Sequence, residues 1–150
     1  MEYGRRVKAR REVLGLSQRA VAERSGVKQP LISAIESGRR EPGARTREAL
    51  DRVLAVRPSE MLRLRRREVM EVIERHRGST PQVFGSVARG TDSPVSDVDL
   101  LVTFTGEAGI TDLLAMEDEL ADLLTVPVDI VSAGSSGKVV ERALREAVPL

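Results

Sequence analysis

Apolar residues recur every three or four positions through the first third of the chain, as they do in a series of short amphipathic helices. The first predicted helix runs from Tyr3 to Leu14, and the second starts after Ser17, whose hydroxyl suits a helix N-cap. The third starts near Lys28 with a proline in its first turn, and a fourth follows Pro42. Glycine follows each of the first three runs, where it favours a helix end. These glycines are Gly15, Gly26 and Gly38.

The stretch 57–77 carries a further amphipathic stripe, starting at Pro58 and ending before Gly78. Its apolar positions fit one long helix or two short ones equally well. The spacing therefore predicts helix here without deciding the number of helices.

The second half alternates between strand and helix patterns. Short apolar runs predict strands over 82–85, 97–104 and 127–131, separated by a helical turn over 86–90 and a helix over 112–124. A closing helix is predicted over 137–147, with four residues facing inward: Val140, Ala143, Leu144 and Ala147. This order is typical of a small α/β sandwich with a mixed sheet, so the whole chain is predicted to be α+β.

Charge divides the chain between residues 77 and 78, where the strand patterns of the second half begin. Residues 1–77 hold 20 Lys and Arg against 11 Asp and Glu, whereas 78–150 hold 4 against 12. A basic half is typical of a module that binds a polyanion. Because only 2% of residues are aromatic, stacking on single strands is disfavoured and duplex DNA is the expected polyanion. The alternatives are a chance difference between solvated faces and a helical bundle used for protein contacts.

Composition also limits the chemistry. The chain has no Cys and one His, His76, which excludes thiol catalysis and multi-histidine zinc sites. Any catalytic metal must therefore be held by carboxylates. The sequence shows no signal peptide and no apolar run of membrane-spanning length, so a cytoplasmic protein is expected.

Three acids stand in two apolar strand candidates. Alternation places Asp97 and Asp99 on one face, and Asp129 completes a cluster if its strand is the neighbour. Three such carboxylates repel one another unless a cation such as Mg²⁺ binds them. The Gly85-Ser86 turn offers backbone N–H groups and a hydroxyl to a phosphate, so the combination indicates nucleotidyl or phosphoryl transfer. Asp92, in the intervening loop, is predicted to be a solvated turn residue.

The stretch R-x-x-x-G-L-S-Q-x-x-V-A-x-x-S-G-V-x-Q-P-x-I-S-x-I-E-x-G, from Arg11 to Gly38, resembles the Cro/repressor (XRE) family of DNA-binding domains. The resemblance implies a five-helix helix-turn-helix domain and an ion pair between Arg11 and Glu36. Lys28 replaces the usual Ser or Thr cap of the third helix. The implied phosphate contacts are Gln18, Arg39 and Arg40, and the implied groove-facing residues are Lys28, Gln29, Ser33 and Ala34.

The segment from Gly85 to Val102 resembles the G-S-x-A-R-G-x5-S-D-x-D-L-L-V signature of minimal nucleotidyltransferases, in the DNA polymerase β superfamily. The resemblance implies that Asp97, Asp99 and Asp129 are catalytic and bind metal, with two Mg²⁺ ions and ATP as the donor. It assigns nucleotide binding to four further residues: Gly85, Ser86, Arg89 and Ser96.

The domains are predicted at 1–63 (helix-turn-helix), 64–78 (linker and first helix of the second domain) and 79–150 (nucleotidyltransferase). Minimal nucleotidyltransferases of this type resemble antitoxins that transfer AMP from ATP to a tyrosine of a HEPN-family toxin. That resemblance implies an antitoxin that also represses its own operon, and a homodimer if the operator is palindromic.

Two alternatives remain open at this stage. One is a DNA-binding regulator whose nucleotidyltransferase-like domain is inactive and only senses nucleotide or binds a toxin. The other is transfer to a small hydroxyl acceptor such as an aminoglycoside, for which the second half leaves little room.

Overall fold

The computed structural model describes residues 2–150, which form two compact units divided between Val56 and Arg57. The first unit is entirely helical, and the second combines helices with a four-stranded sheet. The α+β class predicted from the sequence is therefore confirmed. Among residues 2–150, no helix is both long and apolar enough to cross a lipid bilayer.

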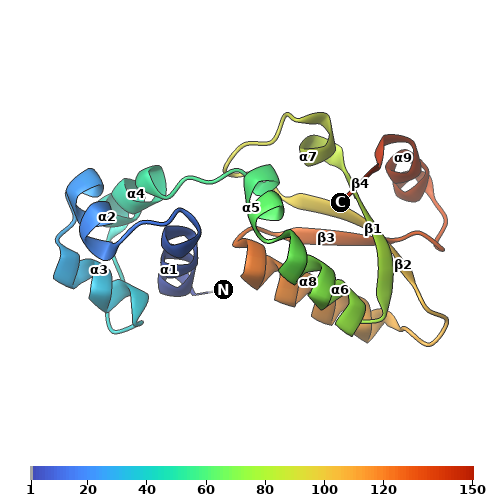
Figure 1. Cartoon of the computed structure of the whole chain (residues 1–150), viewed down its shortest axis with the longest axis horizontal. Helices are drawn as coiled ribbons and strands as arrows, with labels where there is room; N and C mark the ends of the chain where they lie inside the picture. The colour runs from blue at the N-terminus through green and yellow to red at the C-terminus, as the bar shows by residue number, and fades with distance from the viewer. Residues whose placement is uncertain (1) are drawn as a thin grey trace. The chain divides into compact units, whose positions relative to one another are not determined.

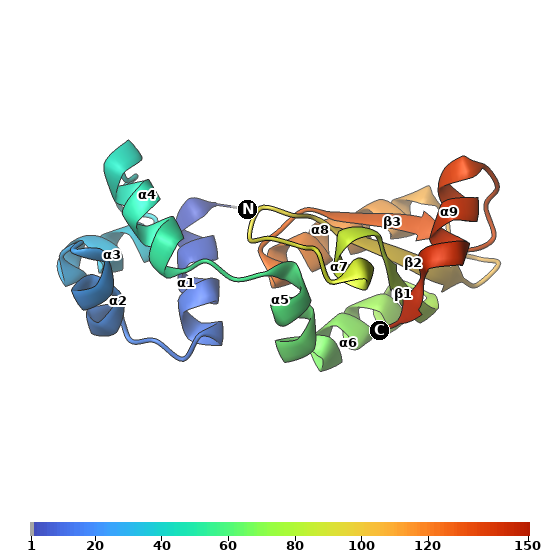
Figure 2. The same ribbon diagram turned by 90° about the horizontal axis from the view of Figure 1, so that it is seen from above.

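The described part of the first unit, residues 2–56, contains four helices, which Figure 2 shows. They are α1 (Tyr3–Val13), α2 (Gln18–Ser25), α3 (Gln29–Glu36) and α4 (Ala44–Val53). Ser17 accepts a hydrogen bond from the Ala20 N–H at 3.0 Å, and Gly26 ends α2 with a φ of 75°, as the sequence predicts. Lys28 gives α3 no side-chain cap, also as predicted.

Apolar side chains from all four helices form the core of this unit. They include Val7, Val21, Ile32 and Leu50, each at most 2% exposed. Tyr3, the single tyrosine of the chain, also lies in this core, and its hydroxyl meets Asp51 at 3.1 Å. The core therefore presents α3 on a rigid scaffold.

The helix α5 (Pro58–Leu64) belongs by its contacts to the second unit. The prediction from the sequence placed a fifth helix in the first domain, residues 1–63. It packs against α6 (Arg66–Arg75) and α8 (Ile110–Leu124), where Met61 and Leu62 are buried. The stripe over 57–77 is thus two short helices. Its apolar positions pack on the second unit. The spacing of these positions predicts helices but does not show which unit they pack against.

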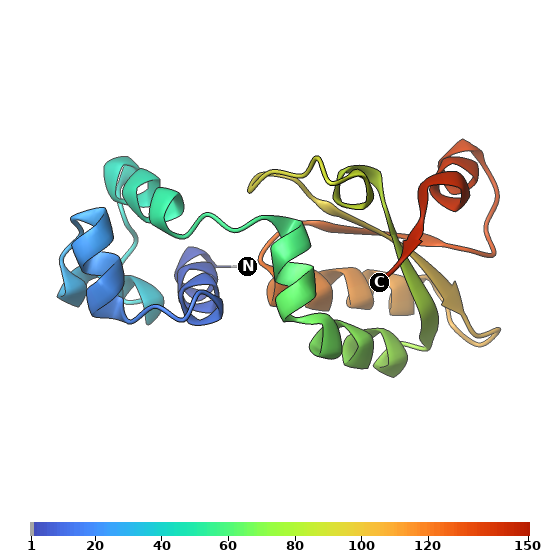
Figure 3. The same ribbon diagram turned by 45° about the horizontal axis from the view of Figure 1, so that its top comes forward.

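The second unit is built on a sheet with strand order β3-β2-β1-β4. Its strands are β1 (Gly78–Phe84), β2 (Val98–Phe104), β3 (Val128–Ser132) and β4 (Val148–Pro149). Strand β2 runs antiparallel to β1 and parallel to β3, and β4 pairs with β1 (Figure 3). The sheet is mixed, as predicted, because the crossover through α8 makes β2 and β3 parallel.

Helices cover both faces of this sheet (Figure 1). On one face lie α6 and α8, whose buried residues include Val72, Ile73, Met116 and Leu120. On the other lie α7 (Gly85–Arg89) and α9 (Lys138–Glu146), over a smaller apolar cluster formed by Phe84, Leu101 and Ala143. Because strand side chains alternate, β2 sends Leu100 to one layer and Leu101 to the other.

Parts of the predicted secondary structure differ from the structure. Leu144, predicted to face inward, is 58% exposed, because α9 buries only the stripe of Val140 and Ala143. The helical turn predicted over 86–90 is α7, which begins and ends one residue earlier, the strand predicted over 82–85 is β1, which runs from Gly78 to Phe84, and β4 has no counterpart in the prediction. A two-residue strand has no periodicity, so only its pairing with β1 defines it.

Asp92 contradicts its predicted role as a solvated turn residue. Its side chain is fully buried, and it accepts hydrogen bonds from Ser59 N–H at 2.8 Å and from Arg57 at 3.0 Å. The carboxylate therefore satisfies an N–H in the first turn of α5, although it lies 33 residues away along the chain. Burial raises the pKa of Asp92, but the Ser59 and Arg57 hydrogen bonds outweigh burial and hold the pKa below its ordinary value.

We predict that Asp92→Ala lowers the free energy of unfolding of the second unit by about 1–3 kcal/mol, because the N–H of half-buried Ser59 and the half-exposed Arg57 lose their partner. A lowered folded-state pKa means that the stabilisation is complete above the ordinary Asp pKa of 3.8 and is lost as the pH falls below it. Urea unfolding at pH 7 and pH 3 measures both effects.

Asp118→Ala, which removes an exposed acid of α8, is the matched control. Equal midpoints for Asp92→Ala and Asp118→Ala at pH 7 would contradict the role assigned to Asp92.

Candidate functional site

Three carboxylates meet at the start of β2. Asp97 immediately precedes this strand and Asp99 is its second residue, so both side chains lie on the face covered by α7 and α9. In the parallel pairing, Asp99 lies directly beside Asp129 of β3. One oxygen from each of the three acids lies within 4.8 Å of the others, so the structure brings together the cluster that the sequence predicts.

Repulsion within this cluster affects the pKa of Asp99. Burial raises the pKa of Asp99, and the charges of Asp97 and Asp129 raise it further. Arg142 and Arg89 act in the opposite direction. The carboxylates are therefore held at close range by the sheet, against their mutual repulsion.

Gly85 makes the approach of β1 to Asp99 possible. It is buried at the start of α7 with a φ of 70°, a conformation that L side chains rarely adopt. A Cβ atom at this position would collide with the carboxylate of Asp99. Glycine is thus required both by the turn and by the acid beside it.

A cavity of about 310 Å³ opens beside the acids. Its lining contains the predicted residues Gly85, Ser86, Arg89, Asp97 and Asp99. It also contains Phe84, Val139 and Arg142, which the sequence analysis did not single out. The last two lie on α9, far from the signature in sequence, and only the packing of that helix brings them to the site.

Ser96 is placed differently from the other signature residues. It is not part of the cavity lining, and its hydroxyl accepts a hydrogen bond from the Ser93 N–H at 2.9 Å. Its observed contact therefore stabilises the turn before Asp97.

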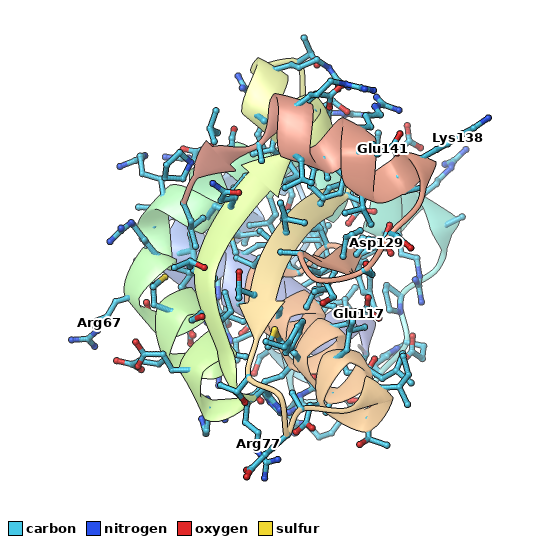
Figure 4. All side chains as sticks on the ribbon, turned by 90° about the vertical axis from the view of Figure 1, so that its right-hand side faces the viewer. Arg67, Arg77, Glu117, Asp129, Lys138 and Glu141 are labelled. Carbon is cyan, nitrogen blue, oxygen red and sulfur yellow. The ribbon has the colours of Figure 1, made fainter. Side chains whose placement is uncertain are left out.

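Glu117, a further carboxylate outside the triad, forms a hydrogen bond with the strand that carries Asp129. Glu117 of α8 accepts a hydrogen bond from the N–H of Ile130 at 2.9 Å. Figure 4 labels Glu117 on α8 and Asp129 on the adjoining strand. Glu117 thereby ties β3 to α8 at the residue next to the metal-ligand candidate. Glu117 falls within the helix predicted over 112–124, and nothing in the sequence pattern singles it out.

The donor set suits a hard divalent cation. Carboxylate oxygens are the preferred protein ligands of Mg²⁺, and three of them converge here. Members of the nucleotidyltransferase family generally use a nucleoside triphosphate and a divalent metal, and the acidic triad fits this requirement.

In the first unit, the predicted ion pair joins Arg11 to Glu36 at 2.6 Å. Gln18 donates to Glu36 at 2.9 Å, and Gln29 donates to Gln18 at 2.8 Å. This chain of contacts fixes the starts of α2 and α3 relative to each other. The buried carboxylate of Glu36 thus accepts three hydrogen bonds, two from Arg11 and one from Gln18.

The residues predicted to contact DNA lie on or next to α3. Lys28 and Gln29 are exposed at its start, Ser33 and Ala34 are half-buried along it, and Arg39 and Arg40 are exposed just after it. Gln18 is half-buried at the start of α2. The structure therefore gathers the predicted DNA-binding residues at α3 and its two ends.

Two domain families match the chain. The helix-turn-helix domain family matches residues 2–64, and the nucleotidyltransferase domain family matches residues 67–148. These matches confirm the two resemblances noted in the sequence.

Two archaeal relatives from Methanocaldococcus jannaschii carry the name "Putative protein adenylyltransferase". One, MJ0126, is 30% identical over 77 residues, which are 51% of this chain and 79% of the relative. The other, MJ0435, is 31% identical over 84 residues, which are 55% of this chain and 90% of the relative.

Among solved structures, one described as a "putative minimal nucleotidyltransferase" is 44% identical with a TM-score of 0.54, over 61% of this chain and 95% of that chain. A structure described as "the toxin-antitoxin with AMP-PNP" shares the fold, at 20% identity and a TM-score of 0.50, over 55% of this chain and 69% of that chain. The chain thus belongs to the nucleotidyltransferase domain family and carries an N-terminal helix-turn-helix domain.

Proposed function

We propose that this protein is a Mg²⁺-dependent protein adenylyltransferase. In this proposal it transfers AMP from ATP to a tyrosine of a cognate HEPN-family toxin, and so acts as the antitoxin. The observation that carries the proposal is the cavity in which Asp97 and Asp99 face the Gly85-Ser86 turn and two arginines. Acids that hold a metal and cations that hold phosphates are the two halves of a site for a metal–triphosphate complex.

The chemistry is the formation of a phosphodiester bond. The acceptor hydroxyl oxygen bonds to the α-phosphorus of ATP, the bond from that phosphorus to the pyrophosphate oxygen breaks, and the hydroxyl proton is released. When bound by Asp97, Asp99 and Asp129, Mg²⁺ supplies charge stabilisation at the phosphates. The protein supplies the alignment, because Gly85 lets the turn lie against Asp99 without a side chain between them.

The acceptor tyrosine comes from outside this chain. Tyr3, its single tyrosine, is 8% exposed, and its hydroxyl contacts Asp51 and the backbone oxygen of Arg47. Burial and the charge of Asp51 raise the pKa of Tyr3 to about 12, and burial keeps the phenol from reaching the cavity of another molecule. A tyrosine-specific transferase of this kind therefore needs a partner protein.

The names of the relatives support a protein as the acceptor. Two relatives, each matched over more than three quarters of its own length, carry the name "Putative protein adenylyltransferase". The structure described as a toxin–antitoxin with AMP-PNP shares the fold. A helix-turn-helix domain on the same chain suits an antitoxin that represses its own operon, and a palindromic operator would require a homodimer.

We predict that Asp97→Asn abolishes transfer, because the triad loses one of its metal ligands while the side-chain volume stays nearly the same. The measurement is transfer of label from α-labelled ATP, with Mg²⁺, to the purified product of the adjacent reading frame. A loss of at least about 100-fold is expected for a group that supports charge stabilisation in the transition state.

Asp118→Asn, which changes an exposed acid of α8, is the control and should transfer label at the wild-type rate. Undiminished transfer by Asp97→Asn would disprove the proposed site. Tight complex formation without transfer by the wild type would instead indicate a regulator that only binds its partner.

DNA binding gives a separate prediction. Arg39→Ala and Gln29→Ala should each weaken binding of the full chain to its promoter fragment, since Arg39 meets a phosphate and Gln29 a base edge in the proposed complex. Arg39→Ala should reduce the slope of log K against log [salt] by about one, whereas Gln29→Ala should leave the slope unchanged and relax sequence preference.

Fluorescence anisotropy between about 50 and 200 mM salt measures both effects. Arg67→Ala, an exposed arginine of α6 outside the first unit, is the matched control. Binding that does not depend on salt would refute the proposed interface.

A further inference from the structure

Two arginines line the same cavity as the catalytic acids. Arg89 ends α7 and Arg142 lies in the middle of α9, and both line the cavity together with Asp97 and Asp99. Both guanidinium groups are close enough to Asp99 to lower its pKa, and Arg142 has the larger effect. The lining of the cavity therefore contains both acidic and basic side chains.

One carboxylate holds both arginines in place. Glu146 accepts a hydrogen bond from Arg142 Nε at 3.1 Å through one oxygen, and from Arg89 Nη1 at 3.1 Å through the other. The hydrogen bond from Arg142 lowers the pKa of Glu146, and the Gly85 backbone and Arg89 lower it further. Glu146 is thus ionised at neutral pH and connects α9 to the Gly85 turn.

Arg142 keeps most of its donors for a ligand. Within residues 2–150, its contact is made through Nε, which leaves the two terminal nitrogens available, and 59% of its side chain is exposed. A guanidinium with two terminal nitrogens presents parallel N–H groups that match two phosphate oxygens. Because Nε is fixed by Glu146, little conformational freedom remains to be lost when a phosphate binds.

We propose that Arg142 binds the triphosphate of the donor nucleotide, together with Arg89, across the cavity from the acidic triad. This inference rests on the proposed function in that the ligand is a nucleoside triphosphate. It adds a residue outside the signature and on a different helix. Arg142 is a binding residue in this arrangement, and Glu146 is the residue that positions it.

The phosphate chain is a better match for Arg142 than the base. Arg142 neighbours Arg89 and a carboxylate that already occupies one edge of each guanidinium. Glu146 supplies one negative charge for two arginines, so the three groups together keep a positive charge, and a triphosphate carries several negative charges that can pair with it. The apolar lining residues Phe84 and Val139 offer no comparable charge.

The test uses the full chain in Mg²⁺ with two probes, a fluorescent ATP analogue and inorganic tripolyphosphate as its competitor. Tripolyphosphate has no base or ribose, so its affinity reports phosphate contacts alone. We expect Arg142→Ala to weaken both affinities by roughly 10- to 100-fold, as for loss of a charged hydrogen-bonding partner. Arg142→Lys, which keeps the charge but not the parallel N–H pair, should recover part of the tripolyphosphate affinity.

Arg145→Ala is the matched control, because Arg145 is exposed on the same helix and does not line the cavity. It should bind both probes like the wild type, and the far-ultraviolet circular dichroism of all variants should coincide. Arg142→Gln serves as a second neutral variant if Arg142→Ala unfolds α9, and it should show the same loss.

Wild-type affinity of Arg142→Gln or Arg142→Ala for tripolyphosphate would overturn the inference. A wild-type protein that binds neither probe would overturn this inference and the nucleotide site together. A third outcome separates the two proposals. If the wild type binds both probes, the Arg142 variants do not, and the wild type transfers no label, Arg142 is supported as a phosphate ligand and the proposed transferase activity is contradicted.

Discussion

The candidate site depends on one constraint, which is that the sheet holds one oxygen from each of three carboxylates within 4.8 Å of the others. Two unit charges at that distance repel by roughly 1 kcal/mol in water and about 3.5 kcal/mol at the effective dielectric of a protein surface. A whole domain is stable by only about 5–15 kcal/mol, so this repulsion is a sizeable opposing contribution. The parallel pairing of β2 with β3 imposes it, because the register places Asp99 directly beside Asp129.

The surroundings of the triad compensate for this repulsion in three ways. Apolar packing of Phe84, Leu101 and Ala143 holds α9 against the sheet just beside the acids. Arg142 and Arg89 place positive charge in the same cavity. The Glu117 carboxylate anchors β3 at Ile130, next to the third acid. These contacts within the protein hold the three acids in position.

Most of the fold could be predicted because its elements are local. Helical spacing, the Ser17 cap and the glycine stops define the helices of the first unit, and each operates within a few residues. The outcome differs for Asp92 and α5, whose environments are set by partners 33 residues apart in sequence. Loop composition correctly indicated a turn around Asp92 but carried no information about the helix start that buries it.

The residues of the candidate site also fall into two groups, those that local sequence identifies and those that only distant partners bring to the site. The sequence by itself determined the chemistry, because Gly85, Asp97 and Asp99 lie within one short signature whose strand alternation puts both acids on one face. Only the tertiary structure decided that Asp129 completes the triad, since that depends on which strands pair and in what register. It also decided that Arg142 and Glu146 belong to the site, because an amphipathic pattern shows which face of α9 is buried but not which groups meet its exposed face.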